Sequence, residues 1–372
     1  MCAARAGGAR YVRPGCEHVF VRWENLTVEQ EKGARLPGFK DPALIRTFDA
    51  PEALGTRFYE VKARSAINQV PKRSRMPFRY TINAYRGCTH ACLYCFARPT
   101  HTYLDFNAHE DFEREIVVKV NAPELVRAEL GRPSWKGEHV ALGTNTDPYQ
   151  WVEGRYRLMP GIWEAMRDFA NPCSVLTKSP LLLRDLELMK QLVEVTDFTA
   201  NLSVPTLDEK AWRETEPHTP HPRKRLEAVG ELNRAGIPTG VLVAPLIPGV
   251  NDAPEQVEEI LQLAGEAGAQ SIGGVGLHLR GEVREIWFDW LRSHRPDLIP
   301  RYEKLYAWGA YLPRAEAERL SGMVRRGGGT RGARKRGGLR NPGGRPGRFR
   351  GTAEEAGDDP APAPDGLQPK LF

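Results

Sequence analysis

The sequence predicts an α/β protein built on parallel strands, and two observations support this. From residue 79 onward, short apolar runs alternate with longer stretches whose apolar residues recur at helical spacing. The chain of 372 residues is 41% hydrophobic and 27% charged, which fits a globular protein long enough for one large domain. Strands that alternate with helices pair in parallel through right-handed crossovers, so we expect one sheet of six such units.

The expected strands and helices follow one another along the chain. The strands are residues 80–84, 139–143, 174–177, 198–204, 239–244 and 271–277, with an extra strand at 116–120 after the first. The helices are residues 123–130, 180–193, 222–235, 254–267 and 282–293. Gly236 is a natural end for the third helix, and Asn251 with Asp252 is expected to cap the fourth.

Composition divides the chain into four parts. Residues 1–75 are predicted to be an irregular extension, 76–312 the core, 313–324 a linker and 325–372 a disordered tail. The tail holds 11 Lys and Arg against 5 Asp and Glu, so it accounts for the whole net charge of +6. No apolar run approaches the roughly 18 residues of a membrane span. The isolated Cys2, Cys16 and Cys173 fit a reducing cytoplasm.

Three cysteines form the densest chemical motif. Cys88, Cys92 and Cys95 have the spacing C-x3-C-x2-C, and clustered thiolates select iron-sulfur clusters, zinc or cuprous copper. Three ligands on a 4Fe-4S cluster would leave one iron open for substrate or cofactor. Zinc bound by these cysteines and one of His90, His101 or His109 is the strongest alternative. Simple packing of three small residues on one helix face is another.

This motif, with Tyr94 directly before the last cysteine, resembles the signature of the radical S-adenosylmethionine (SAM) superfamily. The resemblance implies a 4Fe-4S cluster whose open iron binds SAM, a reductant of the flavodoxin or ferredoxin type, and cleavage of SAM to a 5′-deoxyadenosyl radical. It also implies that the strands form a partial (β/α)6 barrel, with cluster and cofactor at their carboxyl ends. Tyr94 would then pack beside the adenine.

Polar residues just past the strands are the candidates for binding SAM. After the second strand, Thr144, Thr146 and Asp147 suit the amino group of the methionine moiety. An Asp-Pro turn explains Asp147 equally well. After the third strand, Lys178 can pair with the methionine carboxylate, as the resemblance implies.

Candidate residues for binding the cofactor also lie at the ends of two further predicted strands. Asn201 and Ser203 lie on one side of the fourth strand and could reach the ribose or the carboxylate; ordinary polar pairing inside a barrel is the alternative. Arg280 follows the sixth strand and suits the cofactor carboxylate, a substrate phosphate or simply the surface. We assign no catalytic residue.

Within the superfamily, the chain is most similar to the spore photoproduct lyase-like group, whose members are often labelled DNA repair photolyases. The supporting stretches include Glu216-Pro217 and 244–252. Two departures argue against a typical photoproduct lyase. The second strand ends without the cysteine that returns a hydrogen atom in that enzyme, and Phe96 stands where the lyase has a tyrosine.

The tail carries two predicted binding segments. From Arg325 to Arg350 the chain is rich in arginine and glycine without any acid, a composition typical of nonspecific nucleic acid binding. A solubilising tail is the alternative. The last residues, from Gln368 to Phe372, resemble the peptide by which bacterial proteins bind the sliding clamp, and a chain end without a binding role is the alternative.

We therefore expect a cytoplasmic radical SAM enzyme acting on nucleic acid or its components. A radical SAM enzyme for a small molecule or a protein is the second hypothesis, and a nonenzymatic zinc-binding adaptor is the third.

Overall fold

The structure is a computed structural model of the chain and describes residues 28–31, 35–37, 43–48, 53, 55–71, 74 and 76–327. The predicted nucleic acid segment beyond residue 327 and the terminal clamp-like peptide lie outside the described residues. Within the described ranges, no helix is long and apolar enough to cross a bilayer.

A seven-stranded sheet forms the core, in the order β12-β11-β10-β9-β8-β5-β4. All neighbours from β5 to β12 pair in parallel, and only the edge strand β4 is antiparallel. This confirms the six parallel strands expected from the sequence. Their bounds are Tyr80–Ile82 for β5, Val140–Leu142 for β8, Cys173–Thr177 for β9, Phe198–Ser203 for β10, Thr239–Leu246 for β11, Ile272–Gly276 for β12, and Ile67–Gln69 for β4.

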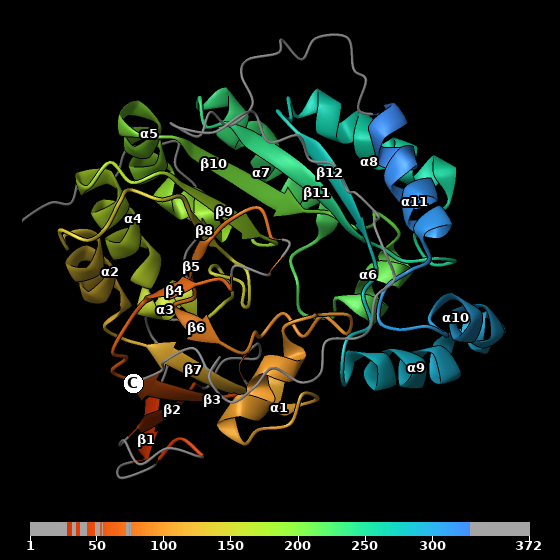
Figure 1. Cartoon of the computed structure of the whole chain (residues 1–372), viewed down its shortest axis with the longest axis horizontal. Helices are drawn as coiled ribbons and strands as arrows, with labels where there is room; N and C mark the ends of the chain where they lie inside the picture. The colour runs from red at the N-terminus through yellow and green to blue at the C-terminus, as the bar shows by residue number, and fades with distance from the viewer. Residues whose placement is uncertain are drawn as a thin grey trace, which may run out of the picture.

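Helices cover one face of this curved sheet, as Figure 1 shows for α4, α5, α7 and α8. The helices along the chain are α1 (Asp111–Arg114), α2 (Ala122–Leu130), α3 (Glu153–Tyr156), α4 (Leu158–Asp168), α5 (Leu186–Val195), α6 (Glu209–Thr215), α7 (Pro222–Arg234), α8 (Pro254–Glu266), α9 (Val283–His294), α10 (Ile299–Leu305) and α11 (Arg314–Gly327). Short 3-10 helices span Arg98–Leu104, Pro180–Asp185 and Pro296–Leu298.

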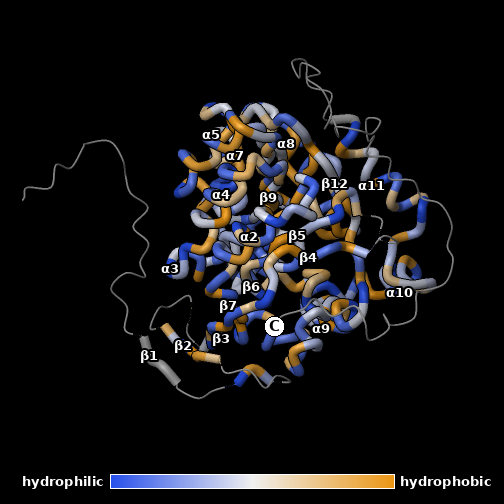
Figure 2. Tube along the Cα trace, turned by 60° about the vertical axis from the view of Figure 1, so that its left-hand side comes forward, coloured by the Kyte–Doolittle hydropathy of each residue, from blue (hydrophilic) through white to orange (hydrophobic). Residues whose placement is uncertain are grey.

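Alternation along each strand decides what faces the helices. In β10, Phe198, Ala200 and Leu202 are buried in the main hydrophobic core with the helices, so Thr199, Asn201 and Ser203 point to the opposite face. The hydropathy colouring of Figure 2 shows apolar segments gathered where strands and helices meet. The polar face of the sheet is therefore left for a site.

The N-terminal extension needs a correction, because its described part is more regular than expected. The strands β1 (Val28–Glu31), β2 (Leu44–Phe48) and β3 (Arg57–Val61) form a second sheet in the order β1-β2-β3-β7-β6. The predicted extra strand is β7 (Glu115–Lys119), and it pairs in parallel with β3. The strand β6 (Tyr85–Arg86) closes this sheet and leads directly into the cysteine motif.

The segment predicted as a linker, residues 313–324, is helical from Arg314 onward, because helix α11 spans Arg314–Gly327. Two glycines of β12 explain how the helix packs. A Cβ atom at Gly274 would lie 2.6 Å from Val324 of α11, and one at Gly276 would lie 3.4 Å from Leu320 of the same helix. Leu320 and Val324 are buried there, so α11 closes over the edge strand despite its polar composition.

The expected cap of α8 is also wrong. Ala253 is the N-cap and makes no side-chain capping bond. Asn251 instead accepts a hydrogen bond from the Ile247 backbone N–H at 2.6 Å and donates to the Pro205 carbonyl at 2.8 Å. The side-chain amide of Asn251 thus fixes the loop after β11. Because it is engaged there, it is not available to cap α8.

Candidate functional site

The cysteine motif is a buried loop that follows β6. Gly87 opens it with a φ of +79°, and a Cβ atom there would lie only 2.7 Å from the Phe112 carbonyl oxygen, so glycine is required. Cys88 and Cys92 are buried in two separate hydrophobic clusters, and Cys95 is partly buried and packs against both clusters. In the described chain, no three Cys, His, Asp or Glu side chains are grouped to hold a single metal ion.

Arg98 holds the far end of the loop, a role that the sequence did not suggest. Its guanidinium donates to the backbone carbonyls of Cys92 and Ala91, each at 3.0 Å, and forms an ion pair with Glu113 at 2.8 Å. Only 2% of this residue is exposed. The loop conformation is therefore fixed by a buried cation that binds main-chain oxygens.

Thr146 and Gln150 hold the near end. The Thr146 hydroxyl donates to the Gly87 carbonyl at 2.6 Å, and Gln150 accepts a hydrogen bond from the Thr89 backbone N–H at 2.9 Å. Both side chains are buried. Thr146 was predicted to bind the cofactor, whereas in the structure its hydroxyl supports the cysteine loop.

Asp147, another predicted cofactor residue, is the centre of a buried hydrogen-bond network. Its carboxylate accepts from the Thr177 hydroxyl at 2.6 Å, the Lys178 backbone N–H at 2.7 Å and the Tyr149 backbone N–H at 2.9 Å. His90 lies 3.3 Å away through Nδ1. Burial alone would raise the pKa of Asp147, but His90 and the other donors outweigh burial and lower it.

A second network gathers Lys178, Tyr94 and Ser203 around Glu216, a fully buried carboxylate. Lys178 Nζ lies 3.1 Å from Glu216 Oε1 and donates to the Ser203 hydroxyl at 2.6 Å. The Tyr94 hydroxyl donates to the same Glu216 oxygen, and Lys178 Nζ lies 5.7 Å from the centre of the Tyr94 ring. Three residues predicted separately from the sequence are thus brought together by one that was not predicted.

Arg225 completes this network from α7. It pairs with Glu216 at 2.6 Å, and both side chains are 0% exposed. It also donates to the Ser203 carbonyl at 2.9 Å. Burial would raise the pKa of Glu216, but Arg225 and Lys178 lower it to about 2. The sequence contains one indication of this pair, because Arg225 interrupts the otherwise apolar face of α7.

Parallel register explains why these groups meet. Thr177 of β9 pairs with Leu202 of β10, and Ser203 of β10 pairs with Leu242 of β11. Lys178 and Ser203 therefore leave neighbouring strands at the same edge of the sheet.

Burial raises the pKa of the three motif thiols, while the positive charge of Lys178 lowers the pKa of Cys92 and Cys95.

The remaining candidates lie outside these two networks. Thr144 donates to Asn83 at 3.3 Å, and the Asn145 backbone N–H donates to the same amide oxygen at 3.1 Å. Asn201 lies two residues before Ser203 on the same face of β10. Arg280 is exposed, and it belongs to neither network.

Two polar atoms of the cysteine loop lack partners. Thr89 Oγ1 and His90 Nε2 are buried, and neither has a hydrogen-bond partner among the described residues. Leaving such a group unpaired costs about 1–3 kcal/mol. Together with three buried thiols, these atoms fit a loop that encloses a group rich in hydrogen-bond acceptors, as the sulfides and thiolates of an iron-sulfur cluster are.

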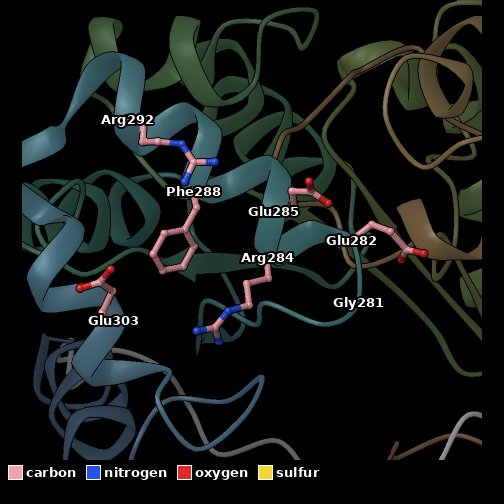
Figure 3. A pocket seen from close by; sticks show the side chains of 7 residues that line it. All are labelled: Gly281, Glu282, Arg284, Glu285, Phe288, Arg292 and Glu303. Atoms are coloured by element: carbon pink, nitrogen blue, oxygen red, sulfur yellow. The ribbon is translucent and has the colours of Figure 1, made fainter.

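An open pocket lies elsewhere, on α9 and α10. Its lining residues are Gly281, Glu282, Arg284, Glu285, Phe288, Arg292 and Glu303, of mixed charge (Figure 3). The Arg284 guanidinium lies 5.3 Å from the Phe288 ring centre. None of these residues belongs to the two networks, so the pocket is separate from the candidate site.

Comparison with known proteins gives related sequences and a related fold. An uncharacterized protein of Mycobacterium tuberculosis is 46% identical over 289 residues, which cover 78% of this chain and 85% of that protein. An uncharacterized protein of Methanocaldococcus jannaschii is 29% identical over 194 residues, covering 52% of this chain and 69% of the other. Sequences similar to this chain therefore occur in a bacterium and in an archaeon.

Among solved structures, spore photoproduct lyase complexed with a dinucleoside spore photoproduct has a TM-score of 0.53 and 18% identity, covering 73% of this chain and 78% of that one. A variant of that lyase with bound AdoMet and the dinucleoside photoproduct has a TM-score of 0.52 and 17% identity, covering 72% and 77%. At this identity the likeness concerns the fold.

The model of the radical SAM superfamily matches residues 82–264, from the cysteine loop to α8. This range contains the three motif cysteines and five of the six parallel strands in whole or in part. The chain belongs to the radical SAM superfamily, enzymes that use a 4Fe-4S cluster and S-adenosylmethionine.

Proposed function

We propose that Cys88, Cys92 and Cys95 hold the 4Fe-4S cluster and leave one iron open for SAM. The observation that carries this proposal is the loop itself, in which three buried thiols lie beside two unpartnered polar atoms. Buried thiols are neutral until a metal displaces their protons, so assembly should release protons and depend on pH. The bound group supplies reductive cleavage of SAM to a 5′-deoxyadenosyl radical.

For the cofactor, we propose that Lys178 and Ser203 face the methionine carboxylate. Lys178 is 14% exposed through its side chain and is held between Glu216 and Ser203, so its ammonium group is fixed in place before the cofactor arrives. Tyr94 is buried beside it and would pack near the adenine. Glu216 and Arg225 then serve as supports that orient Lys178.

Thr144 and Asn201 remain candidates for the cofactor's amino group and ribose, because neither hydroxyl nor amide is taken into the two buried networks. Thr146 and Asp147 fit better as supports of the cysteine loop, since their oxygens already have partners there. Arg280 would contact the cofactor or a substrate phosphate only from an exposed position.

We propose a nucleic acid or one of its components as the substrate, in a repair or modification reaction. The fold shared with a lyase solved with a dinucleoside photoproduct supports this, as does the arginine- and glycine-rich segment from Arg325 to Arg350. The clamp-like peptide from Gln368 to Phe372 would bring such an enzyme to DNA. A flavodoxin or ferredoxin would supply the electron, and the cytoplasm is the compartment that the free thiols suit.

The chain lacks a thiol where a typical photoproduct lyase would need one. The residues of β8 and the turn after it contain no cysteine. Cys173 is buried at the opposite end of β9, five residues before Lys178, or ~17 Å at about 3.3 Å per residue. Phe96 has no hydroxyl to relay a hydrogen atom. We therefore propose a reaction other than thymine photoproduct reversal.

Anaerobic turnover tests this function. The enzyme, reconstituted with iron and sulfide and reduced with dithionite, should convert SAM to 5′-deoxyadenosine, and the Cys92→Ala variant should not. Repeating the reaction with deuterated oligonucleotides should place deuterium in 5′-deoxyadenosine. Product without label transfer would reject the nucleic acid substrate, and no product at all would reject the enzyme.

A further inference from the structure

Lys119 is a buried lysine at the end of β7, and only 3% of it is exposed. Lysine is almost never this buried unless an acid pairs with it. Within the described ranges, no hydrogen bond or ion pair engages its ammonium group. The acid whose charge acts on it is Glu129, but that carboxylate accepts hydrogen bonds from the backbone N–H groups of Ala66 and Ile67 at 3.3 and 2.8 Å. Among these residues, Lys119 is therefore a buried cation without a direct counter-ion.

The pairing of β6 with β7 brings a second cation to the same place. Arg86 lies opposite Val117 in this antiparallel pair, so Lys119, two residues further along β7, projects from the same face. Arg86 is partly buried, and in the described part of the chain its guanidinium has no acidic partner either. Burial and then the charge of Arg86 lower the pKa of Lys119 to about 8. The two cations thus lie close enough to repel each other.

Two titratable neighbours on this side of β7 do not offset the pair. Glu115, four residues before Lys119, faces Arg57 of β3 at 3.9 Å. The Nε2 atom of His101 lies 2.9 Å from the Glu115 carbonyl oxygen, and burial lowers the pKa of this histidine to about 4, so it is neutral. Two positive charges gathered inside a protein destabilise it unless an anion lies with them.

The pair lies next to the cysteine loop. Arg86 directly precedes Gly87, which opens that loop. The Lys119 backbone N–H donates to the Ala84 carbonyl at 3.0 Å, where the chain passes from β5 of the main sheet to β6 of the second sheet (Figure 1). A ligand held by the two cations would therefore adjoin the segment that carries the three cysteines.

Phosphate oxygens suit this pair of side chains. A guanidinium group presents a planar fork of N–H donors that matches a phosphate, and an ammonium group binds it as a point charge. We propose that Arg86 and Lys119 form a binding site for a phosphate group beside the cysteine loop. The site goes beyond the proposed function, because a phosphodiester of nucleic acid and a phosphomonoester of a small molecule carry the same kind of oxygen. Lys119 then lowers the stability of the free protein, and bound phosphate offsets this loss.

Thermal unfolding of the full-length enzyme tests this site, with inorganic phosphate as the probe and sodium chloride to keep the ionic strength constant. The Tm of the wild type should rise with phosphate. Lys119→Met removes the buried charge and keeps an apolar side chain. Its Tm without phosphate should therefore exceed that of the wild type, and its affinity for phosphate should be at least about 10-fold lower. The control Lys62→Met removes an exposed charge just past β3 and should respond to phosphate as the wild type does.

Arg86→Gln measures the other half of the pair and decides the question if Lys119→Met does not fold. Its affinity for phosphate should also fall at least about 10-fold. The proposal is overturned if the wild type does not respond to phosphate, or if the folded variants respond as strongly as the wild type. It is also overturned if Lys119→Met is less stable than the wild type by the same amount with and without phosphate, because Lys119 would then have only a structural role.

Two further probes identify the source of the phosphate group. A dinucleotide with one phosphodiester should raise the Tm of the wild type but not of Arg86→Gln if the ligand belongs to nucleic acid. A response to glycerol phosphate without a response to the dinucleotide would still support the site, and would assign it to small phosphomonoesters. A response to inorganic phosphate alone would overturn the proposal, as binding of an adventitious ion only. These measurements follow unfolding rather than turnover, so failure of the site leaves the formation of 5′-deoxyadenosine to be judged separately.

Discussion

Replacing Arg225 by methionine should destabilise the protein strongly, because it leaves the Glu216 carboxylate buried without its closest cation. Both side chains are 0% exposed and lie 2.6 Å apart. Removing one partner of such a pair costs about 3–5 kcal/mol. The pKa of Glu216 gives a consistent figure. Arg225 and Lys178 lower it from 4.5 to about 2 against the effect of burial, a shift worth about 3 kcal/mol at neutral pH.

Thermal unfolding of the metal-free chain measures this effect. A loss of about 3–5 kcal/mol corresponds to a Tm lower by roughly 6–20 °C for a domain of this size. The control is Arg223→Met on the same helix, where the ion pair with Glu259 is half-exposed on both sides. That pair is worth at most about 1 kcal/mol, so its Tm should fall by no more than about 4 °C. Equal shifts for the two variants would refute the view that Arg225 neutralises a buried charge.

Three further predictions follow from the site and the tail. Lys178→Met should weaken SAM binding about 10- to 150-fold, as measured by isothermal titration calorimetry, because it removes one charged hydrogen bond. The control Lys190→Met, which breaks an exposed ion pair, should leave the affinity for SAM unchanged. If the two variants bind SAM equally well, Lys178 is not part of the cofactor site. Gly143→Ala should lower the free energy of unfolding by more than about 1 kcal/mol, because φ is +85° and the new Cβ would lie 1.9 Å from a backbone oxygen. The control is Gly137→Ala, where φ is +67° but the space around the new Cβ is open, so only the cost of the backbone torsion remains. An equal loss of unfolding free energy in both variants would show that the close contact at Gly143 has no effect. Deleting residues 328–372 should abolish salt-dependent binding of DNA and RNA in gel-shift assays, and full retention would contradict a role for the tail.

The sequence predicted the parallel sheet because its strands are local patterns. Short apolar runs bounded by turns, such as the run that forms β10, can be recognised as strands without knowing which strands they pair with. The cysteine loop was equally local. Helix α11 was missed because its apolar face is narrow, and its partners are the glycines of β12, about 50 residues away. Composition alone could not show that a polar segment would pack on a strand.

The supports of the site were harder to predict for the same reason. Glu216 and Arg225 lie far from the cysteine loop in sequence, and their meeting with Tyr94 and Lys178 depends on the register of three strands. Lys178 could be proposed from its place after a strand, but its ion pair with the buried Glu216 could not. Asp147 lies beside the cysteine loop in the structure, and its contact with His90 could be found only in the folded chain.

The account depends most directly on an iron-sulfur cluster with one iron open to SAM. Anaerobically purified protein, analysed for metal and acid-labile sulfide and then examined by electron paramagnetic resonance, tests this. The account predicts iron and sulfide in equal amounts, a signal of a reduced 4Fe-4S cluster, and a change in that signal when SAM is added. Equimolar zinc in a colourless protein, or a cluster signal that SAM does not change, would contradict it.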